Sequence, residues 1–260
     1  MGSYYWPWAR WGRLWDCTAL TAAMAFADDV IDAMDYETRH VALDQWHATA
    51  EERGAFTLDE QCDQLVKRLA RGFGTYLAPT QFERLIGALK EPSYACVEAA
   101  RRAAEGTDLD SFNAYMELRR DTNGYAFHEM LIEMTLEVDM SGIIGQEPMR
   151  GLLAYDAERL TALDGLMTIT KGLSEGTDSD NLVFVLAGMR GITSLQEAVD
   201  AAFDFAREAE KRYRRQARVV LDSTLGNRDD VRRFVSGLDG ALAGLIAVLP
   251  QASRYSKPGG

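Results

Sequence analysis

Cysteine is scarce in this sequence, and its few cysteines are scattered. Only three of the 260 residues are cysteine, namely Cys17, Cys62 and Cys96, and none forms a CxxC pair. An odd number of isolated cysteines argues against a disulfide framework and against a cysteine-based zinc site. We therefore expect the protein to work in a reducing compartment.

The sequence also lacks a long apolar run, a signal peptide and an excess of basic residues. No stretch approaches the length of a membrane span, and the opening MGSYYWPWARW has no apolar centre. With 28 Lys and Arg against 40 Asp and Glu, the net charge of -12 disfavours nucleic acid, which is bound by basic surfaces. We expect a cytoplasmic protein with no nucleic-acid partner and no membrane span, in which an anionic ligand requires local cations or metal.

Alternating strand patterns are absent as well, whereas helical periodicity covers most of the chain. With 47% hydrophobic residues, the chain can bury a large core, so we expect one all-α domain over residues 1–260 with a Trp/Tyr-rich stub at 1–11 and a flexible tail at 256–260. Breaks are expected at the segments LKEPS, EGTD, DTNG, GQEP, SEGTDSDN and LGNRDD. The expected helices cover residues 12–35, 41–51, 58–73, 79–104, 109–122, 125–140, 150–173, 180–190, 194–222 and 229–247.

A row of aspartates follows the most apolar part of the first helix. From Leu20 to Ala27 nearly every residue is small or apolar, which predicts a buried helix, and Asp28, Asp29 and Asp32 come directly after it. Asp28 and Asp32 lie one turn apart on one face, where like charges repel each other unless a cation is present. Magnesium suits such a place, because it binds a few carboxylates, water and substrate phosphates. A solvated helix end is the alternative interpretation.

Two further segments carry aromatic residues together with arginine. In FNAYMELRRDTNGYAF, Phe112, Tyr115 and Arg119 share a helix face just before the TNG breaker, and SRYSKPGG near the end carries Arg254 and Tyr255. An amphipathic helix with a solvated arginine pair is the alternative for the first segment. Taken alone, the second segment predicts nothing.

A third segment, ALDGLMTITKGLSEGTDSDNL, carries polar residues at helical spacing. Asp164, Thr168 and Lys171 would project from one face of another apolar helix. The alternative is structural, since a threonine in the middle of a helix usually bonds to its own backbone.

Together these segments resemble the class I terpene synthases, particularly the bacterial terpene cyclases, over residues 20 to 255. The resemblance implies an α-helical bundle, here with a shortened N-terminus, that ionises and cyclises a prenyl diphosphate and releases diphosphate. It also implies Mg²⁺ as cofactor, with up to three ions that bind together with the diphosphate. Farnesyl diphosphate is the favoured substrate and a sesquiterpene the expected product. The resemblance leaves room for a homodimer.

The resemblance also implies roles for individual side chains. The magnesium ligands would be Asp28, Asp29, Asp32, Asp164 and Thr168. The catalytic contacts to the diphosphate would come from Arg119 as its sensor, Lys171, Arg254 and Tyr255. The substrate-binding residues would be Thr21, Met24, Ala25, Phe112, Tyr115, Arg120, Thr122 and Asn123. Of these, Arg120 is the second choice for the sensor, and Thr122 and Asn123 take the linker and effector positions. Tyr125 and Phe127 are additional candidates for stabilising a carbocation.

The chain departs from the family pattern at two of these motifs. Gly172 stands where the family has a glutamate that binds magnesium, and Glu175 could replace it only with a remodelled helix end. An aromatic residue usual near the C-terminal Arg-Tyr pair is Val248 here. Gly172 and the shortened N-terminus favour, as an alternative, a weakly active or non-catalytic relative that binds prenyl diphosphates.

Two other enzyme classes fit the sequence less well. A chain-elongating prenyltransferase carries a second DDxxD motif, but the only other DD, in NRDDVRRF, has arginine in place of the last aspartate. A di-iron bundle requires two Glu-x-x-His pairs plus two more carboxylates, and the sequence shows one pair, Glu37 and His40.

Overall fold

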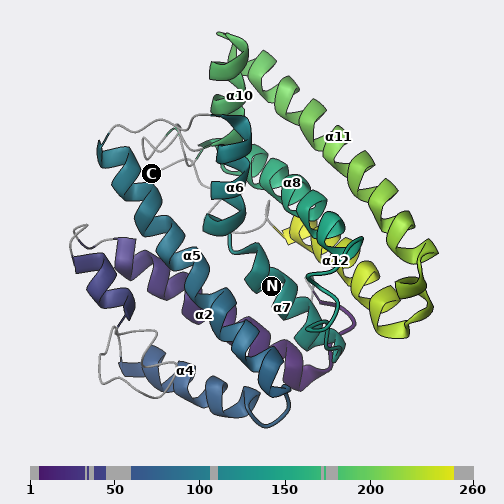
Figure 1. Ribbon diagram of the computed structural model, residues 1–260. Helices are drawn as coiled ribbons and strands as arrows, with labels where there is room; N and C mark the ends of the chain where they lie inside the picture. The colour runs from purple at the N-terminus through teal and green to yellow at the C-terminus, as the bar shows by residue number, and fades with distance from the viewer. Residues whose placement is uncertain are drawn as a thin grey trace. The chain divides into compact units, whose positions relative to one another are not determined.

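The computed structural model describes residues 6–32, 34, 38–44, 60–105, 111–170, 173 and 181–248 (Figure 1). Every regular element in these ranges is helical, which confirms the all-α prediction. The named elements are α2 (Trp11–Asp32), α4 (Glu60–Phe73), α5 (Pro79–Glu105), α6 (Phe112–Thr122), α7 (Tyr125–Leu136), α8 (Met149–Met167), α10 (Leu182–Arg190), α11 (Leu195–Asp222), the 3-10 helix η2 (Thr224–Asn227) and α12 (Asp229–Val248). A short helix also covers residues 38–44.

The chain divides into two compact units, and each is described by itself. The first unit consists mainly of Trp8–Gly142. In this unit α2 packs against α4 and α7, and α5 packs against α6 and α7. Its buried residues include Leu20, Leu85 and Ile132. The second unit is mainly Ile143–Gly260, in which α8 and α11 lie side by side with α10 and α12 against them (Figure 1).

Helix α2 is buried on one side only, so the prediction that it is buried all round is wrong. Cys17, Leu20 and Ala23 are buried, whereas Thr21 and Phe26 are exposed. The buried side faces α4 and α7, which are the helices that α2 contacts in its own unit. The small apolar residues of this helix therefore report close packing on one side rather than full burial.

Helix α5 runs unbroken through Pro92, so the break predicted at LKEPS is also wrong. Proline removes one N–H from the helical ladder and costs about 3 kcal/mol in a helix interior. The bond that Pro92 cannot make is the one to the Ala88 carbonyl, and the Ser93 hydroxyl donates to the next carbonyl, that of Leu89, at 3.4 Å. Leu89 and Val97 are both buried, so packing on either side of the proline holds the helix together.

A buried carboxylate fixes α7 against α5. The Glu133 side chain is fully buried, and the Arg84 guanidinium donates to its two oxygens at 2.7 and 3.1 Å. The Gln81 amide and the Met140 backbone N–H donate to the same carboxylate at 3.1 and 3.0 Å. Because a buried charge is tolerated only when it is paired and hydrogen-bonded, this cluster holds the two helices in one register.

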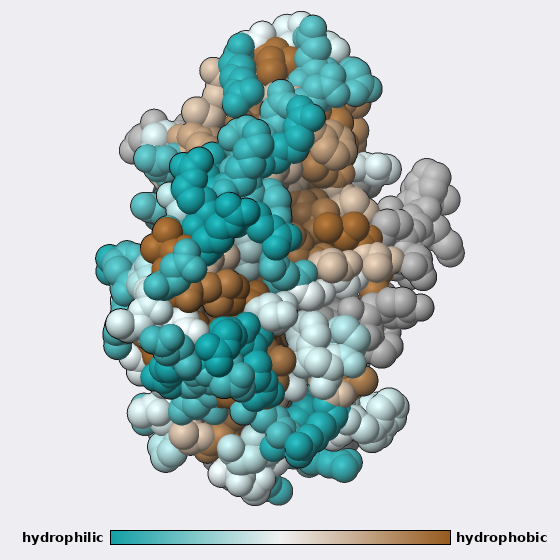
Figure 2. Space-filling model, turned by 90° about the vertical axis from the view of Figure 1, so that its right-hand side faces the viewer, coloured by the Kyte–Doolittle hydropathy of each residue, from teal (hydrophilic) through white to brown (hydrophobic). Residues whose placement is uncertain are grey.

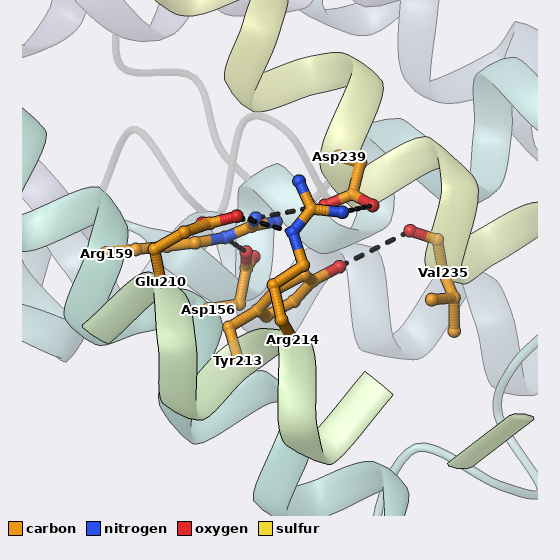
Figure 3. Close-up of polar contacts among 7 residues, drawn as sticks. All are labelled: Asp156, Arg159, Glu210, Tyr213, Arg214, Val235 and Asp239. Carbon is orange, nitrogen blue, oxygen red and sulfur yellow. Dashed lines mark hydrogen bonds and ion pairs between the residues drawn. The ribbon is translucent and has the colours of Figure 1, made fainter. Parts of the chain in front are cut away.

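A buried arginine joins three helices of the second unit (Figure 3). The Arg159 guanidinium, on α8, lies 2.6 Å from Asp156 and 3.3 and 3.0 Å from Glu210 on α11 and Asp239 on α12. It also stacks 3.3 Å from the ring centroid of Tyr213. Arg214 donates to Glu210 and Asp239, so the cluster has three carboxylates for two guanidinium groups.

The burial of Asp156 in this cluster predicts a pH dependence of stability. Burial raises the pKa of Asp156 from 3.8 to about 6, because desolvation outweighs the attraction of Arg159. A raised pKa in the folded state stabilises the protein fully below pH 4, and this contribution is lost as the pH rises toward 6. One pKa unit corresponds to about 1.4 kcal/mol, so the change is about 3 kcal/mol. We expect the stability of Asp156→Asn relative to the natural chain to rise by this amount between pH 4 and 7 in urea unfolding, and a constant difference would contradict the assignment.

Hydrophilic side chains cover much of the face drawn in Figure 2, with separate hydrophobic patches between them. In the described ranges, no single helix is both long and apolar enough to cross a membrane. Of the described helices, only α10 and α11 taken together reach the required length and composition, and the chain bends by 106° between them.

Candidate active site

The aspartate row lies on the last two turns of α2. Asp28, Asp29 and Asp32 belong to this helix, which ends at Asp32, although their side chains lie outside the described part of the structure. Helical spacing puts Thr21 and Ala25 on the side that carries Asp28, and both of these residues are exposed. The backbone therefore presents the aspartates at a helix end, next to an exposed row of small residues.

The predicted break at TNG is confirmed between α6 and α7. Helix α6 ends at Thr122, Asn123 caps it by donating its N–H to the Arg119 carbonyl at 3.0 Å, and Gly124 takes the left-handed conformation with φ of 66°. A Cβ atom at Gly124 would lie 3.1 Å from Pro92 of α5. Glycine is therefore required here for its positive φ and for the close approach of α5.

The two arginines before this break lie on different sides of α6. Arg119 is one turn after Tyr115, whose side chain is 2% exposed, and Arg119 itself is partly buried. Arg120 is exposed. Phe112 stacks on Tyr115 with ring centroids 6.0 Å apart. Of the two arginines, Arg119 thus lies with the aromatic side of the helix, as the sequence pattern predicts.

A groove of about 710 Å³ opens on the Arg120 side of the break. It lies between α5 and the start of α7, and Gly124 forms part of its wall. Charged groups of both signs line it, namely Lys90, Glu91, Glu98, Arg120 and Asp121. This groove therefore does not offer the mainly positive surface that a diphosphate would need.

The linker and effector candidates have distinct environments at this break. The Thr122 hydroxyl oxygen is buried and has no hydrogen-bond partner among the described residues, while its carbonyl accepts from the Cys96 thiol at 3.7 Å. The Asn123 amide donates to the Tyr125 hydroxyl at 2.7 Å. Asn123 is thus held by its own segment, and Thr122 keeps a hydroxyl with unused hydrogen-bonding capacity.

Helix α8 ends earlier than the sequence predicts. It stops at Met167 instead of residue 173, and Thr168 forms a bend before helical structure resumes at residues 169–170. The Thr168 N–H and hydroxyl both donate to the Asp164 carbonyl, at 2.9 and 2.7 Å. The Gly165 carbonyl, which a continuing helix would use, accepts instead from the Asn181 amide at 2.9 Å. A side chain inserted into the helical ladder in this way explains the break.

Asn181 is the site feature that sequence reasoning did not single out. Its amide donates to the Thr168 hydroxyl at 3.1 Å as well as to Gly165, and its carbonyl oxygen accepts from the Val183 N–H at 2.9 Å. It thereby caps α10 and closes the end of α8. The available signal was its position directly before an apolar helix, which is typical of an N-cap residue.

Several predicted site residues lie outside the described residues. These are Lys171, Gly172, Glu175, Arg254 and Tyr255. Val248, by contrast, is the last residue of α12 and is buried. The proposed contacts of the residues outside the description remain predictions.

The donor atoms available to a metal are oxygens. Asp164 is partly buried at the end of α8, and the Thr168 hydroxyl, after one donation and one acceptance, keeps a lone pair. This donor chemistry fits Mg²⁺, which prefers oxygen ligands. Among the described side chains, which do not include those of Asp28, Asp29 and Asp32, no group of three His, Cys, Asp or Glu residues could hold a metal.

The structure also bears on the two rival enzyme classes. In NRDDVRRF, Asp230 pairs with Arg228 at 2.6 Å and Asp229 with Arg232 at 3.8 Å, so both carboxylates are used by neighbouring cations. His40 packs against the Tyr94 ring with centroids 5.5 Å apart, and its predicted partner Glu37 lies outside the described residues. These contacts favour neither a second metal motif nor a di-iron site.

Solved structures similar to this chain are terpene synthases. One is 2-methylisoborneol synthase from Streptomyces coelicolor A3(2) in complex with Mg²⁺ and geranyl-S-thiolodiphosphate, at a TM-score of 0.82 and 16% identity over 98% of this chain and 83% of that one. Linalool/nerolidol synthase from Streptomyces clavuligerus in complex with 2-fluorogeranyl diphosphate has a TM-score of 0.80 and 16% identity, over 98% of this chain and 86% of that one. Germacradien-4-ol synthase from Streptomyces citricolor has a TM-score of 0.77 and 17% identity, over 95% of this chain and 81% of that one. These likenesses show the fold.

The family is shown by the sequence itself. No curated protein matches the chain in sequence. Residues 19–212, however, match the family described as terpene synthase family 2, C-terminal metal binding. Because this match covers most of the chain, the protein belongs to the terpene synthase family, and it is an enzyme of the lyase class that acts on a prenyl diphosphate.

Proposed function

We propose that this chain is a magnesium-dependent class I terpene synthase that ionises and cyclises farnesyl diphosphate to a sesquiterpene and releases diphosphate. The observation that carries the proposal is the position of the three motifs. The aspartate row is at the end of α2, Arg119 is one turn before the α6–α7 break, and Thr168 is at the end of α8. Helix ends and breaks are where side chains and free backbone groups can meet a ligand.

In the proposed mechanism the protein binds the diphosphate through positively charged side chains and through magnesium ions. Arg119 donates hydrogen bonds to the diphosphate oxygens, with Lys171, Arg254 and Tyr255 as further donors. Asp28, Asp29, Asp32, Asp164 and Thr168 would hold up to three magnesium ions. Magnesium supplies the positive charge that takes up the negative charge of the leaving diphosphate as the allylic C–O bond breaks.

The carbocation left behind requires a dry pocket with aromatic faces. A ring quadrupole stabilises a nearby cation by about 0.5 to 2 kcal/mol, and water would quench the cation. Tyr115, with its side chain 2% exposed and stacked on Phe112, is the best-placed aromatic residue for this role on α6. Thr21, Met24 and Ala25 are the proposed lining beside the aspartates, where small side chains leave room for the substrate.

Product analysis tests the proposed substrate and reaction. The purified protein would be incubated with Mg²⁺ and either farnesyl or geranyl diphosphate, and the extract separated by gas chromatography with mass spectrometry. We expect a cyclic fifteen-carbon product from farnesyl diphosphate that disappears with a chelator. Two of the similar structures hold ten-carbon geranyl analogues. A product from geranyl diphosphate alone would overturn the substrate assignment and leave the reaction class intact.

Gly172 supports a second candidate, a weakly active relative with a high magnesium requirement. Its position corresponds to a glutamate ligand in the family, and a glycine offers no oxygen from a side chain. We expect Gly172→Glu to lower the magnesium concentration for half-maximal turnover roughly tenfold, a change of about 1.4 kcal/mol in metal binding. Gly172→Gln, similar in size but neutral, is the matched control and should have a smaller effect. An unchanged magnesium requirement in a folded Gly172→Glu variant would show that the site does not need this ligand.

A further inference from the structure

Asn181 uses its hydrogen-bonding groups on three neighbours at once. Its amide N–H groups donate to the Gly165 carbonyl at 2.9 Å and to the Thr168 hydroxyl at 3.1 Å. Its carbonyl oxygen accepts from the Val183 N–H at 2.9 Å. The residue is 7% exposed, so water does not replace these partners readily. Asparagine combines two amide donors with an acceptor in a side chain of this length, which aspartate, serine and threonine do not.

These bonds fix the direction of the Thr168 hydroxyl. Its hydrogen is directed at the Asp164 carbonyl, 2.7 Å away, and one oxygen lone pair receives the Asn181 N–H. A hydroxyl oxygen has two lone pairs, so one remains, and its direction is set by the two bonds already made. Thr168 therefore presents one oriented acceptor instead of a freely rotating hydroxyl.

The glycine at position 165 brings the two helices close enough for this contact. A Cβ atom at Gly165 would lie 2.7 Å from the Cβ of Leu182, the first residue of α10. Real Cβ atoms do not approach so closely, so any other residue would push the start of α10 away from the end of α8. Gly165 and Asn181 act together, one by allowing the approach and the other by using it.

We propose that Asn181 is a positioning residue for the metal site on α8. Its amide orients the Thr168 hydroxyl so that the remaining lone pair can bind Mg²⁺, and its second N–H holds the end of α8 that carries Asp164. This role rests on the proposed function, which assigns Thr168 and Asp164 to the metal. Groups that orient a metal ligand typically contribute 10- to 100-fold to metal affinity.

The substitution Asn181→Asp separates the two roles of this residue. Aspartate keeps the acceptor and is as good an N-cap as asparagine, so the start of α10 stays capped. It offers no N–H, so Thr168 and the Gly165 carbonyl lose their donor. Asn227→Asp is the matched control, because it makes the same change of charge at an exposed position in the same unit. Asn181→Ser, which also keeps a capping oxygen but is too short to reach Thr168, is the second variant should aspartate prevent folding.

Calorimetry of inorganic diphosphate binding at increasing Mg²⁺ concentration measures how tightly the metal site binds magnesium, without requiring turnover. We expect Asn181→Asp or Asn181→Ser to raise the magnesium concentration for half-maximal binding roughly 10- to 100-fold. Asn227→Asp should leave it unchanged. In a Thr168→Val background, Asn181→Asp should add less than about a twofold change, because the group it orients is already gone.

The outcomes separate this proposal from the proposed function. Should Asn181→Asp and Asn181→Ser lower the melting temperature but not change the magnesium requirement, Asn181 is only a structural cap and the proposal is wrong. Full magnesium-dependent binding in Thr168→Val, in a chain that turns over its substrate, would overturn the proposal and leave the proposed function standing. A natural chain without turnover and without magnesium-dependent diphosphate binding would overturn both.

Discussion

Asp28→Ala is expected to lower the magnesium-dependent turnover of farnesyl diphosphate by a factor of about 1,000 or more. Asp28 lies on the last turns of α2, on the side shared with Thr21 and Ala25. A metal that polarises a leaving group contributes several kcal/mol to transition-state stabilisation, and each 1.4 kcal/mol is a factor of ten in rate. Loss of a charged ligand should therefore remove most of the rate. The measurement is product formation over a range of Mg²⁺ concentrations.

The folding of this variant must be checked separately. Helical circular dichroism should be unchanged, because alanine is the best helix former and removes a repulsive charge from the row. Asp200→Ala, an exposed aspartate on α11, is the matched control for the change of charge and should keep its turnover. Turnover at the natural rate in a folded Asp28→Ala chain would remove Asp28 from the metal site.

Arg119→Ala is expected to weaken magnesium-dependent binding of inorganic diphosphate roughly 10- to 100-fold. A hydrogen bond to a charged group contributes about 1.5 to 3 kcal/mol, and Arg119 is partly buried on the side of α6 that carries Tyr115. Arg119→Lys should recover only part of the affinity, because lysine keeps the charge but not the planar fork. Isothermal calorimetry at fixed Mg²⁺ measures both.

Arg120 provides the matched comparison, since it has the same chemistry one residue further along. It is exposed and lines the groove of mixed charge between α5 and α7. Arg120→Ala should therefore have a smaller effect on diphosphate binding than Arg119→Ala. The reverse order would mean that the sensor is Arg120 and that the aromatic side of α6 does not face the diphosphate.

Most helices could be predicted because residues near their ends in the sequence determine where they begin and end. Glycine and capping residues end them, and the TNG break appears in the structure with Gly124 at φ of 66°. The break at Pro92 was predicted wrongly, because burial of Leu89 and Val97 on either side decides whether a helix survives a proline. Such packing depends on residues distant in sequence and has no local signal.

The candidate site was predictable only as far as its motifs are continuous in sequence. The spacing of Asp164 and Thr168 predicted that both lie on one face of a helix that continues to residue 173. The helix α8 instead ends at Met167, where the Asn181 amide bonds to Gly165 and Thr168. The Asn181 side chain thus contacts Thr168, which is 13 positions away in the sequence, and Gly165, which is 16 positions away. Periodicity describes a regular helix and carries no signal for a side chain that interrupts it.

Release of inorganic diphosphate from farnesyl diphosphate by the purified chain shows whether the protein ionises this substrate, whatever hydrocarbon is formed. We expect release that requires Mg²⁺, stops when a chelator is added, and is lost in Asp28→Ala. Release that continues in the presence of the chelator, or that is as fast in Asp28→Ala as in the natural chain, would contradict this expectation.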